Sequence, residues 1–180
     1  MSETFRIDRE EITVRLMEPA DAEQVFACRT HPDVVELQGW FPRSMDEVRE
    51  LARLQEGQSP GDPGVQQVVI EWRGEYIGDL GVITEENGRQ TEIGVAVLPE
   101  HHGRGFATIA CRMLISELFR RGIHRVTARI DPRNAASQRL LKRLDFREEG
   151  HMKKSFWDSR RQEWDDELLF ALLEEEWPAF

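Results

Sequence analysis

The stretch PEHHGRGFAT at residues 99–108 decides the fold prediction, because it leaves one predicted strand and enters a predicted helix. Gly103 and Gly105 let the backbone come close to a ligand and leave consecutive N–H groups exposed where the helix begins. The helix dipole and these unpaired donors favour a phosphate group. The stretch therefore predicts a pyrophosphate-binding turn, and a glycine turn that merely starts a helix is the structural alternative.

Two familiar phosphate-binding motifs do not fit this stretch. The dinucleotide motif Gly-x-Gly-x-x-Gly is absent, and no Gly-Lys-Ser/Thr sequence follows, as a P-loop would require. The sequence therefore disfavours both a dinucleotide-binding fold and a P-loop.

Upstream of this stretch, apolar periodicity predicts a strand, two helices and three further strands. The expected elements are a strand at 12–16, a helix opened by residues 19–21, a helix from Ser44 to about Gln55, and strands at 68–72, 76–84 and 90–98. Ser44 and Glu47 have the spacing of a capping box. Tight turns at 73–75 and 86–88 join the three strands into an antiparallel meander.

Downstream, helical spacing runs from Phe106 to Leu118 and stops at Gly122. A strand at 124–130, a short helix at 134–144 and two β segments at 146–157 and 164–172 complete the pattern. The helix between two strands predicts a parallel crossover. The expected fold class is therefore α/β (α+β), with a mixed, mostly antiparallel central sheet flanked by helices, and ligands are expected where neighbouring strands diverge.

The composition predicts one globular domain over residues 1–180. Hydrophobic residues make up 39% and charged residues 32% of the chain, which is typical of a folded domain rather than a disordered one. The formal net charge of −10 disfavours a nucleic-acid partner, which would need clustered basic residues. It suits a cationic substrate.

Targeting and metal signals are missing from the sequence. No apolar run reaches the length of a signal peptide or of a membrane span, so we expect no membrane partner. Cys28 and Cys111 form no CxxC motif, and the histidines show no metal-ligand spacing. We therefore expect no metal, two buried reduced thiols and a cytoplasmic location.

The GRGFA sequence at 103–107 resembles the acyl-CoA signature of the GNAT acetyltransferase superfamily, Gln/Arg-x-x-Gly-x-Gly/Ala. Gly105 and Ala107 match the signature, whereas His102 stands where the family usually has Gln or Arg. The departure leaves the backbone N–H groups in place. The resemblance implies acetyl-CoA as co-substrate and a sheet that is splayed at the CoA cleft.

A second stretch, NAASQRLLKRLDF at 134–146, is similar to the superfamily's Asn-x-x-Ser helix that ends in Leu-Gly-Phe. Asp145 replaces the glycine, and aspartate tolerates the left-handed conformation that a helix end requires. Softer features along the whole chain resemble the RimJ/RimL branch of the superfamily, which acetylates the N-termini of ribosomal proteins and includes relatives that act on other amines.

The resemblance implies a set of acetyl-CoA-binding residues on the turn, the strand before it and the Asn-x-x-Ser helix. They are Val95, Val97, His102, Gly103, Arg104, Gly105, Phe106, Ala107, Thr108, Asn134 and Ser137. Taken alone, Asn134 would be a helix N-cap and Ser137 an exposed hydroxyl. The backbone near Val95 and Val97 is implied to polarise the acyl carbonyl.

Amine acetylation needs a group that takes a proton from the amine and one that serves the departing thiolate. Glu92, on the strand before the turn, is the predicted base, with an exposed strand glutamate as the alternative. Many GNAT enzymes carry a tyrosine on the Asn-x-x-Ser helix, but this chain has Leu140 and Leu141 there and its one tyrosine is Tyr76. Ser137 is the remaining hydroxyl, and water is the other proton source.

Trp40 and Phe41 are predicted walls of the acceptor pocket, because the loop between the two N-terminal helices covers this cleft in relatives; a packed corner is the alternative. Asp166 is a further candidate for the acceptor pocket. His151 is another, and both rank below Glu92 because a lone histidine or aspartate on a strand is more often a surface group.

The predicted function is acetyl-CoA-dependent N-acetylation of a primary amine, with a protein N-terminal amine as one acceptor. A small-molecule amine such as a polyamine, an aminoglycoside or an amino acid is the alternative acceptor. A non-catalytic acyl-CoA sensor is the alternative function. The resemblance leaves open whether the chain is a monomer or a homodimer.

Overall fold

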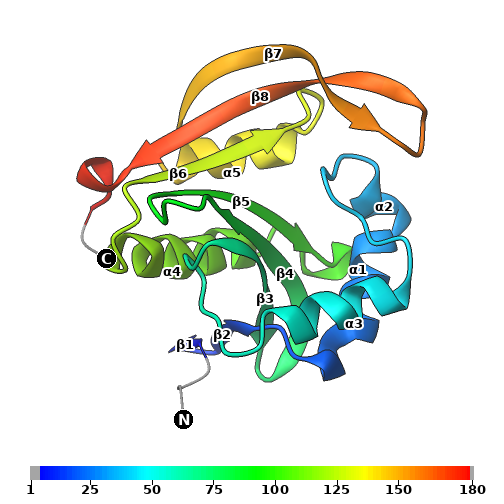
Figure 1. Ribbon diagram of the computed structural model, residues 1–180, viewed down its shortest axis with the longest axis vertical. Coiled ribbons are helices and arrows are strands. Elements are labelled where there is room, and N and C mark those ends of the chain that lie inside the picture. The colour runs from blue at the N-terminus through cyan, green and yellow to red at the C-terminus, as the bar shows by residue number, and fades with distance from the viewer. Residues whose placement is uncertain (1–4, 179–180) are drawn as a thin grey trace.

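The computed structural model describes residues 5–178, which form an eight-stranded sheet with helices packed on both faces (Figure 1). The strands are β1 (Arg6–Arg9), β2 (Ile12–Leu16), β3 (Gly64–Trp72), β4 (Glu75–Thr84), β5 (Gln90–Val97), β6 (Arg125–Ile130), β7 (Arg147–Asp158) and β8 (Glu163–Leu173). The helices are α1 (Ala22–Thr30), α2 (Pro32–Val35), α3 (Met45–Leu54), α4 (Phe106–Arg120) and α5 (Ala135–Arg143). Short 3₁₀ turns lie at Pro19–Asp21, Pro99–His101 and Glu174–Glu176.

The strands lie in the order β1-β2-β3-β4-β5-β6-β8-β7. Every neighbouring pair is antiparallel except β5 and β6, which are parallel and joined through α4. The mixed, mostly antiparallel sheet with one parallel crossover, predicted from the sequence, is confirmed.

Two short elements, β1 and α2, lie outside the sequence prediction. The β1 sequence RIDR is charged and exposed on the sheet edge, so it carries no alternating pattern. The single turn of α2 begins at Pro32, and the ring Nδ1 of His31 accepts the N–H of Asp33 at 3.2 Å. Elements this short depend on local contacts rather than on apolar periodicity.

The predicted helix boundaries have physical causes that the structure shows. Ser44 Oγ accepts the Glu47 N–H at 3.2 Å at the start of α3, and the Glu47 carboxylate accepts the Arg43 N–H at 3.0 Å rather than the Ser44 N–H. Gly122, with φ +90°, follows α4, and Asp145 takes the left-handed conformation with φ 64° after α5. The predicted stop at Gly122 and the tolerance of Asp145 are confirmed.

Both faces of the central strands are buried, and β3 shows how. Val68 and Ile70 point into the core cluster under α4, whereas Val69 between them packs with Val25 of α1 and Val48 of α3. Because the side chains of a strand alternate between faces, α4 covers one face while α1 and α3 cover the other.

The sheet opens where its only parallel pair separates. β5 and β6 pair at Gln90 with Arg125, Thr91 with Val126 and Glu92 with Thr127, and pairing stops there. β5 continues beside β4 to Val97, and β6 continues beside β8 to Ile130. Figure 1 shows the two halves of the sheet spreading apart beyond this point.

Within residues 5–178, no helix is long and apolar enough to cross a membrane. No group of three or more His, Cys, Asp or Glu side chains in that range could hold a metal ion. Cys28 and Cys111 are buried free thiols, as predicted.

A buried ion pair joins α1 to the sheet. Arg29 Nε donates to Asp79 Oδ1 at 2.7 Å, and the two side chains are 3% and 0% exposed. We predict that Asp79→Ala lowers the free energy of unfolding by about 3–5 kcal/mol in urea denaturation, because the arginine would stay buried without its counter-charge.

The matched control is Glu50→Ala, which removes the partner of the exposed Arg53 at 3.3 Å. It should change the free energy of unfolding by less than about 1 kcal/mol. A similar small loss for Asp79→Ala would show that the buried pair does not hold α1 on the sheet.

Candidate functional site

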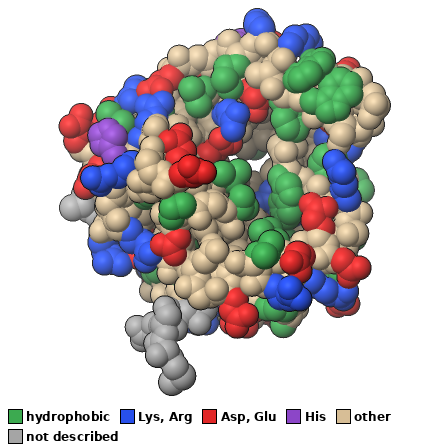
Figure 2. All heavy atoms as spheres, viewed as in Figure 1, with side chains coloured by type: hydrophobic (Ala, Val, Ile, Leu, Met, Phe, Trp, Pro, Cys, Tyr) green, Lys and Arg blue, Asp and Glu red, His purple; other side chains and the backbone are tan. Residues whose placement is uncertain are grey.

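A cavity of about 980 Å³ lies where β5 and β6 diverge. Its lining comes from α1, the loop before α3, α3 and the strands β3 to β8, and also from Asn134 and Ser137 at the start of α5. A smaller pocket on the α4 and α5 side shares Gly94, Val95 and Ser137 with it. The cavity therefore passes through the split in the sheet. Figure 2 shows the hollow, with apolar, acidic and basic side chains around its rim.

The register of β3, β4 and β5 places three cross-strand rows on this face of the sheet, and the residues of the first two rows line the cavity. The outer row is Val65, Ile83 and Glu92, the middle row is Gln67, Gly81 and Gly94, and the inner row is Val69, Asp79 and Ala96. Directly opposed side chains in an antiparallel pair have Cβ atoms about 4.5–5.5 Å apart. The outer row is therefore mainly apolar and exposed, the middle row carries two glycines, and the inner row is buried.

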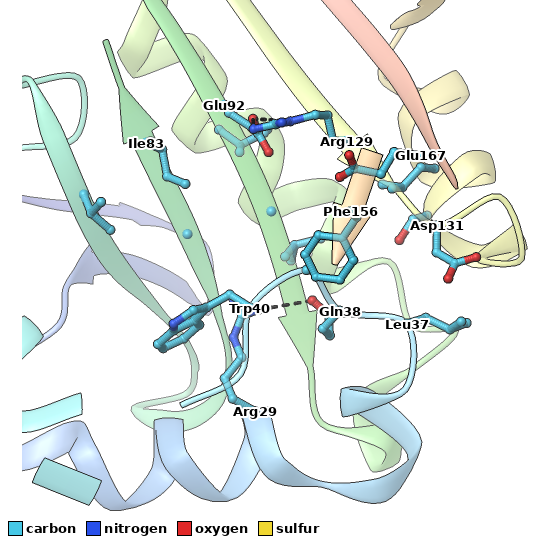
Figure 3. Close-up of a pocket in the computed structure, with 18 of the residues that line it drawn as sticks. Arg29, Leu37, Gln38, Trp40, Ile83, Glu92, Arg129, Asp131, Phe156 and Glu167 are labelled. Carbon is cyan, nitrogen blue, oxygen red and sulfur yellow. Dashed lines mark hydrogen bonds and ion pairs between the residues drawn. The ribbon is translucent and has the colours of Figure 1, made fainter. Parts of the chain in front are cut away.

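The inner row closes the cavity against α1. Asp79 accepts hydrogen bonds from Arg29, from the amide of Gln67 and from the hydroxyl of Tyr76. Arg29 Nη1 also donates to Gln38 Oε1 at 3.1 Å, and its guanidinium lies 5.3 Å from the ring centre of Trp40 (Figure 3). The buried ion pair thus fixes the loop that carries Gln38 and Trp40.

Glu92 lies at the vertex of the split, because it is the last residue of β5 that pairs with β6. Arg129 of β6 reaches back across the split, with Nε 2.8 Å and Nη2 2.6 Å from Glu92 Oε2 (Figure 3). The hydrogen bond to Glu92 raises the pKa of Arg129. Both contacts use Glu92 Oε2, and Glu92 lines the cavity.

The glycine turn before α4 has the backbone that the sequence predicts. Gly103 and Gly105 have φ values of +72° and +83°, and a Cβ added at either would meet no atom within 4 Å. The His102 ring Nε2 lies 2.7 Å from the Val97 carbonyl oxygen, to which it donates. The turn is therefore anchored to the end of β5 and leaves open space in front of the N-terminus of α4, a helix of fifteen residues.

Four other residues of the predicted CoA set lie around this turn. The Arg104 guanidinium lies 4.4 Å from the ring centre of Trp72 and 4.9 Å from that of Phe106, which is buried. Thr108 Oγ1 accepts from Arg143 at 3.3 Å and so joins α4 to α5. Ala107 packs against the core. None of Phe106, Ala107 or Thr108 needs its side chain free for a ligand that binds the backbone.

At the start of α5, Asn134 caps the helix. Its Oδ1 accepts the Ser137 N–H at 3.0 Å, so the N-cap role that the sequence allows is confirmed. Asn134, Ser137 and Val95 all line the cavity. Val97 is buried with the core under α4.

The predicted acceptor residues take different places. Trp40 and Asp166 line the cavity, whereas Phe41 is not among its lining residues and packs 4.9 Å from the Arg160 guanidinium. Asp166 is held by Lys153 at 2.9 Å, and His151 lies 2.9 Å from it. The hydrogen bond from Lys153 lowers the pKa of Asp166 below the usual value of a carboxyl.

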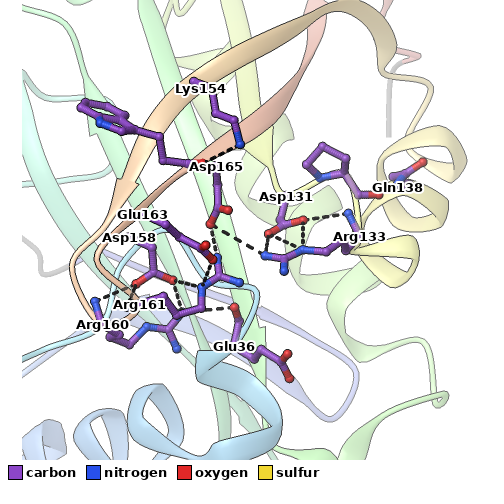
Figure 4. Close-up of polar contacts among 12 residues, drawn as sticks. Glu36, Asp131, Arg133, Gln138, Lys154, Asp158, Arg160, Arg161, Glu163 and Asp165 are labelled. Carbon is purple, nitrogen blue, oxygen red and sulfur yellow. Dashed lines mark hydrogen bonds and ion pairs between the residues drawn. The ribbon is translucent and has the colours of Figure 1, made fainter.

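One contact across the mouth of the cavity has no sequence signal. Arg160, in the turn between β7 and β8, donates to the Glu36 carbonyl oxygen at 3.1 Å (Figure 4). Its guanidinium also lies 4.9 Å from the ring centre of Phe41. The buried carboxylate of Asp158 holds Arg160 at 2.9 Å and Arg161 at 3.0 Å. These contacts tie the β7–β8 hairpin to the loop before α3.

A family model described as Acetyltransferase (GNAT) domain matches residues 11–147. The chain belongs to the GNAT acetyltransferase family. An N-acetyltransferase called p20 from Bacillus licheniformis, named as uncharacterized, is 29% identical over 173 residues, which cover 93% of this chain and 96% of the relative. A spermidine N(1)-acetyltransferase from Vibrio cholerae is 24% identical over 154 residues, covering 84% and 87%.

Solved structures agree with the fold. The structure of RimL, a ribosomal L7/L12 alpha-N-protein acetyltransferase, in complex with coenzyme A matches this GNAT chain with a TM-score of 0.79 at 19% identity, covering 94% of this chain and 98% of that one. Proteins of the GNAT fold bind acetyl-CoA. These relatives act on different amines, so membership of the family does not determine the acceptor.

Sequence reasoning missed Arg129, Gly81 and Gly94 as parts of the site. An arginine on a strand and a glycine in a strand carry no motif, and Arg129 is 37 residues from Glu92 along the chain. Only the register of β4, β5 and β6 brings them together. For the two glycines, a weak signal was present, since glycine inside a strand often marks a close approach of a ligand.

The two thiols are predicted to be inert in the native protein. Burial raises the pKa of Cys28, beside the inner row, to about 12, and it does the same for Cys111 of α4. The thiolate is the reactive form, so at pH 8 roughly one thiol in ten thousand is ionised. Ellman's reagent should therefore react with neither thiol until urea unfolds the chain. Rapid reaction of one thiol in the native protein would contradict this prediction.

Proposed function

We propose that this GNAT chain transfers an acetyl group from acetyl-CoA to a primary amine. The observation that carries the proposal is the cavity that passes through the split between β5 and β6, with α4 and α5 on one side and the acidic and apolar groove on the other. Two reactants can therefore approach from opposite faces and meet beside Val95 and Ser137.

The glycine turn fits the phosphates of acetyl-CoA. The space in front of Gly103 and Gly105 is open, and the first N–H groups of α4 have no partner within the helix. The acyl end would lie near Ser137 and Asn134. Asn134 Oδ1 is used by the helix cap, so its Nδ2 is the group that would donate to the ligand.

When bound, acetyl-CoA supplies the activated thioester. The amine arrives protonated and must lose a proton before it attacks, and Glu92 Oε1 would accept that proton directly or through a water. Arg129 fixes the orientation of Glu92 by occupying Oε2. The backbone N–H groups near Val95 would polarise the acyl carbonyl, and Ser137 Oγ would hydrogen-bond to the departing sulfur.

The first experiment measures acetyl-CoA affinity by calorimetry for the parent chain and for Gly105→Val. A valine at φ +83° costs about 1–2 kcal/mol, which forces the turn to change shape. The affinity should fall at least tenfold while circular dichroism stays unchanged. Gly74→Val is the matched control, because Gly74 has φ +82° and free space in the β3–β4 hairpin. Equal affinities in all three proteins would refute acetyl-CoA binding at this turn.

The second experiment tests the proton acceptor. Glu92→Gln should lower kcat/KM for CoA release about 100-fold or more at pH 7, because an amide keeps the shape but cannot take the proton. Glu149→Gln is the control. Glu149 pairs, outside the cavity, with Arg125 of β6, the strand that also carries Arg129. If kcat/KM for Glu92→Gln fell less than threefold, Glu92 would be only a structural partner of Arg129.

A sensor that binds acyl-CoA without turnover is the second candidate function. It is favoured by the position of Tyr76, whose hydroxyl donates to Asp79 at the inner row and whose pKa is raised by burial. This tyrosine is thus unable to serve as an acid at the other face, where α5 carries Leu140 and Leu141. Tight CoA binding, with no release of CoA from acetyl-CoA in the presence of any amine, would support the sensor function.

A further inference from the structure

The side of the cavity that faces solvent is apolar. Leu54, Val65 and Ile83 are 65%, 48% and 50% exposed, and all three line the cavity. Single exposed apolar residues are ordinary on protein surfaces, but these three lie together. Val65 and Ile83 are direct cross-strand partners, and Ile83 is the direct partner of Glu92. An apolar path therefore leads from the vertex of the split to solvent.

The middle row makes this path a slot. Gly81 and Gly94 are cross-strand partners, and a Cβ added to Gly94 would meet no atom within 4 Å. Phe156 of β7 faces the slot from the opposite half of the sheet (Figure 3). Between the outer row and Phe156, the floor has no side chain at Gly81 or Gly94, and the amide of Gln67 borders it beside Gly81.

The carboxylates around the cavity are mostly neutralised by cations of this chain. Glu92 pairs with Arg129 at 2.6 Å, and Asp131 pairs with Arg133 at 2.5 Å. Asp158 and Asp165 pair with Arg161, Asp166 pairs with Lys153, and Glu50 pairs with Arg53. A ligand cation would have to displace a guanidinium or ammonium group from each of them.

Three lining carboxylates have no ion-pair partner within residues 5–178. Glu36 is exposed at the mouth, and Glu47 accepts the Arg43 N–H at the start of α3. Glu167 of β8 accepts only the Ser155 hydroxyl at 2.8 Å and lies beside Arg129 and Phe156 (Figure 3). Arg129 is the cation beside both Glu92 and Glu167, so the two carboxylates keep one unit of negative charge between them, which suits one ammonium group.

We propose that the acceptor is a primary amine with a single positive charge on an apolar body. Its ammonium group lies between Glu167 and Glu92, and its body lies on the glycine slot and the outer row beneath Leu54. This inference rests on the proposed acetyltransfer and names its acceptor class. A polyamine fits less well, because each further ammonium group meets apolar walls or carboxylates that are already paired.

The test compares matched acceptors with the intact chain and acetyl-CoA. Hexylamine and hexane-1,6-diamine have the same length and differ in the second charge. We expect kcat/KM for hexylamine to exceed that for the diamine and for spermidine at least tenfold, because each further ammonium group would lose its water against apolar walls without gaining a free carboxylate. Peptides with an N-terminal leucine or an N-terminal lysine form the second arm, which separates a peptide source from a small-molecule source.

A variant in the outer row moves the preference, and its readout is a ratio of two acceptors because Ile83 is the cross-strand partner of the proposed base Glu92, whose loss would affect both acceptors. Ile83→Glu places a carboxylate at the end of the path, so the ratio of hexylamine to diamine efficiency should fall at least tenfold. Trp164→Glu is the control, because Trp164 is 52% exposed and does not line the cavity, and it should leave the ratio unchanged. Both sites are exposed, so melting temperatures near that of the parent are expected.

Each outcome decides one of the two claims. A preference for spermidine or the diamine, or an unchanged ratio in Ile83→Glu, overturns the acceptor class and leaves acetyltransfer standing. Preference for the leucine peptide over both hexylamine and the lysine peptide supports the class and assigns it to peptides. Acetyl-CoA binding with no acceptor turned over overturns the inference and favours the sensor. Failure to bind acetyl-CoA overturns the proposed function itself.

Discussion

The brief parallel pairing of β5 with β6 is the constraint on which the site depends. Three residue pairs join the strands, and each strand then keeps only its antiparallel neighbour, β4 or β8. A parallel pair needs a long connection, which here is α4. The crossover therefore sets a helix N-terminus at the open end of β5, next to the place where the strands part. The cavity and the glycine turn are two results of one topological switch.

Cross-strand register turns this opening into a chemically graded groove. Because each row of opposed residues takes one side chain from β3, β4 and β5, neighbouring rows differ completely in character. The outer row is apolar up to Glu92, the middle row carries two glycines, and the inner row carries Asp79. Arg129 closes the vertex from β6. A shift of one residue in any one of these strands would move that strand's member of every row to the other face of the sheet.

Residues of the inner row both shape the groove and stabilise the fold. Arg29 and Asp79 are buried together, and the same arginine reaches Gln38 and Trp40 in the loop over the cavity. A buried ion pair contributes little net stability over apolar packing, yet losing one partner is costly. We infer that the pair is kept because it holds the loop in one position against the sheet.

The sequence by itself determined the order of elements, the parallel crossover, the glycine turn before α4 and the helix cap at Asn134, because these depend on apolar period, turn chemistry and neighbours close along the chain. The tertiary structure alone decided that Arg129 occupies one oxygen of Glu92, that Gly81 and Gly94 form a slot, and that arginines neutralise most carboxylates of the cavity. These features depend on strand register and on contacts between residues distant in sequence, such as Arg160 with Glu36, which are 124 residues apart. No local sequence pattern encodes such long-range contacts, because they are set by how the whole sheet packs.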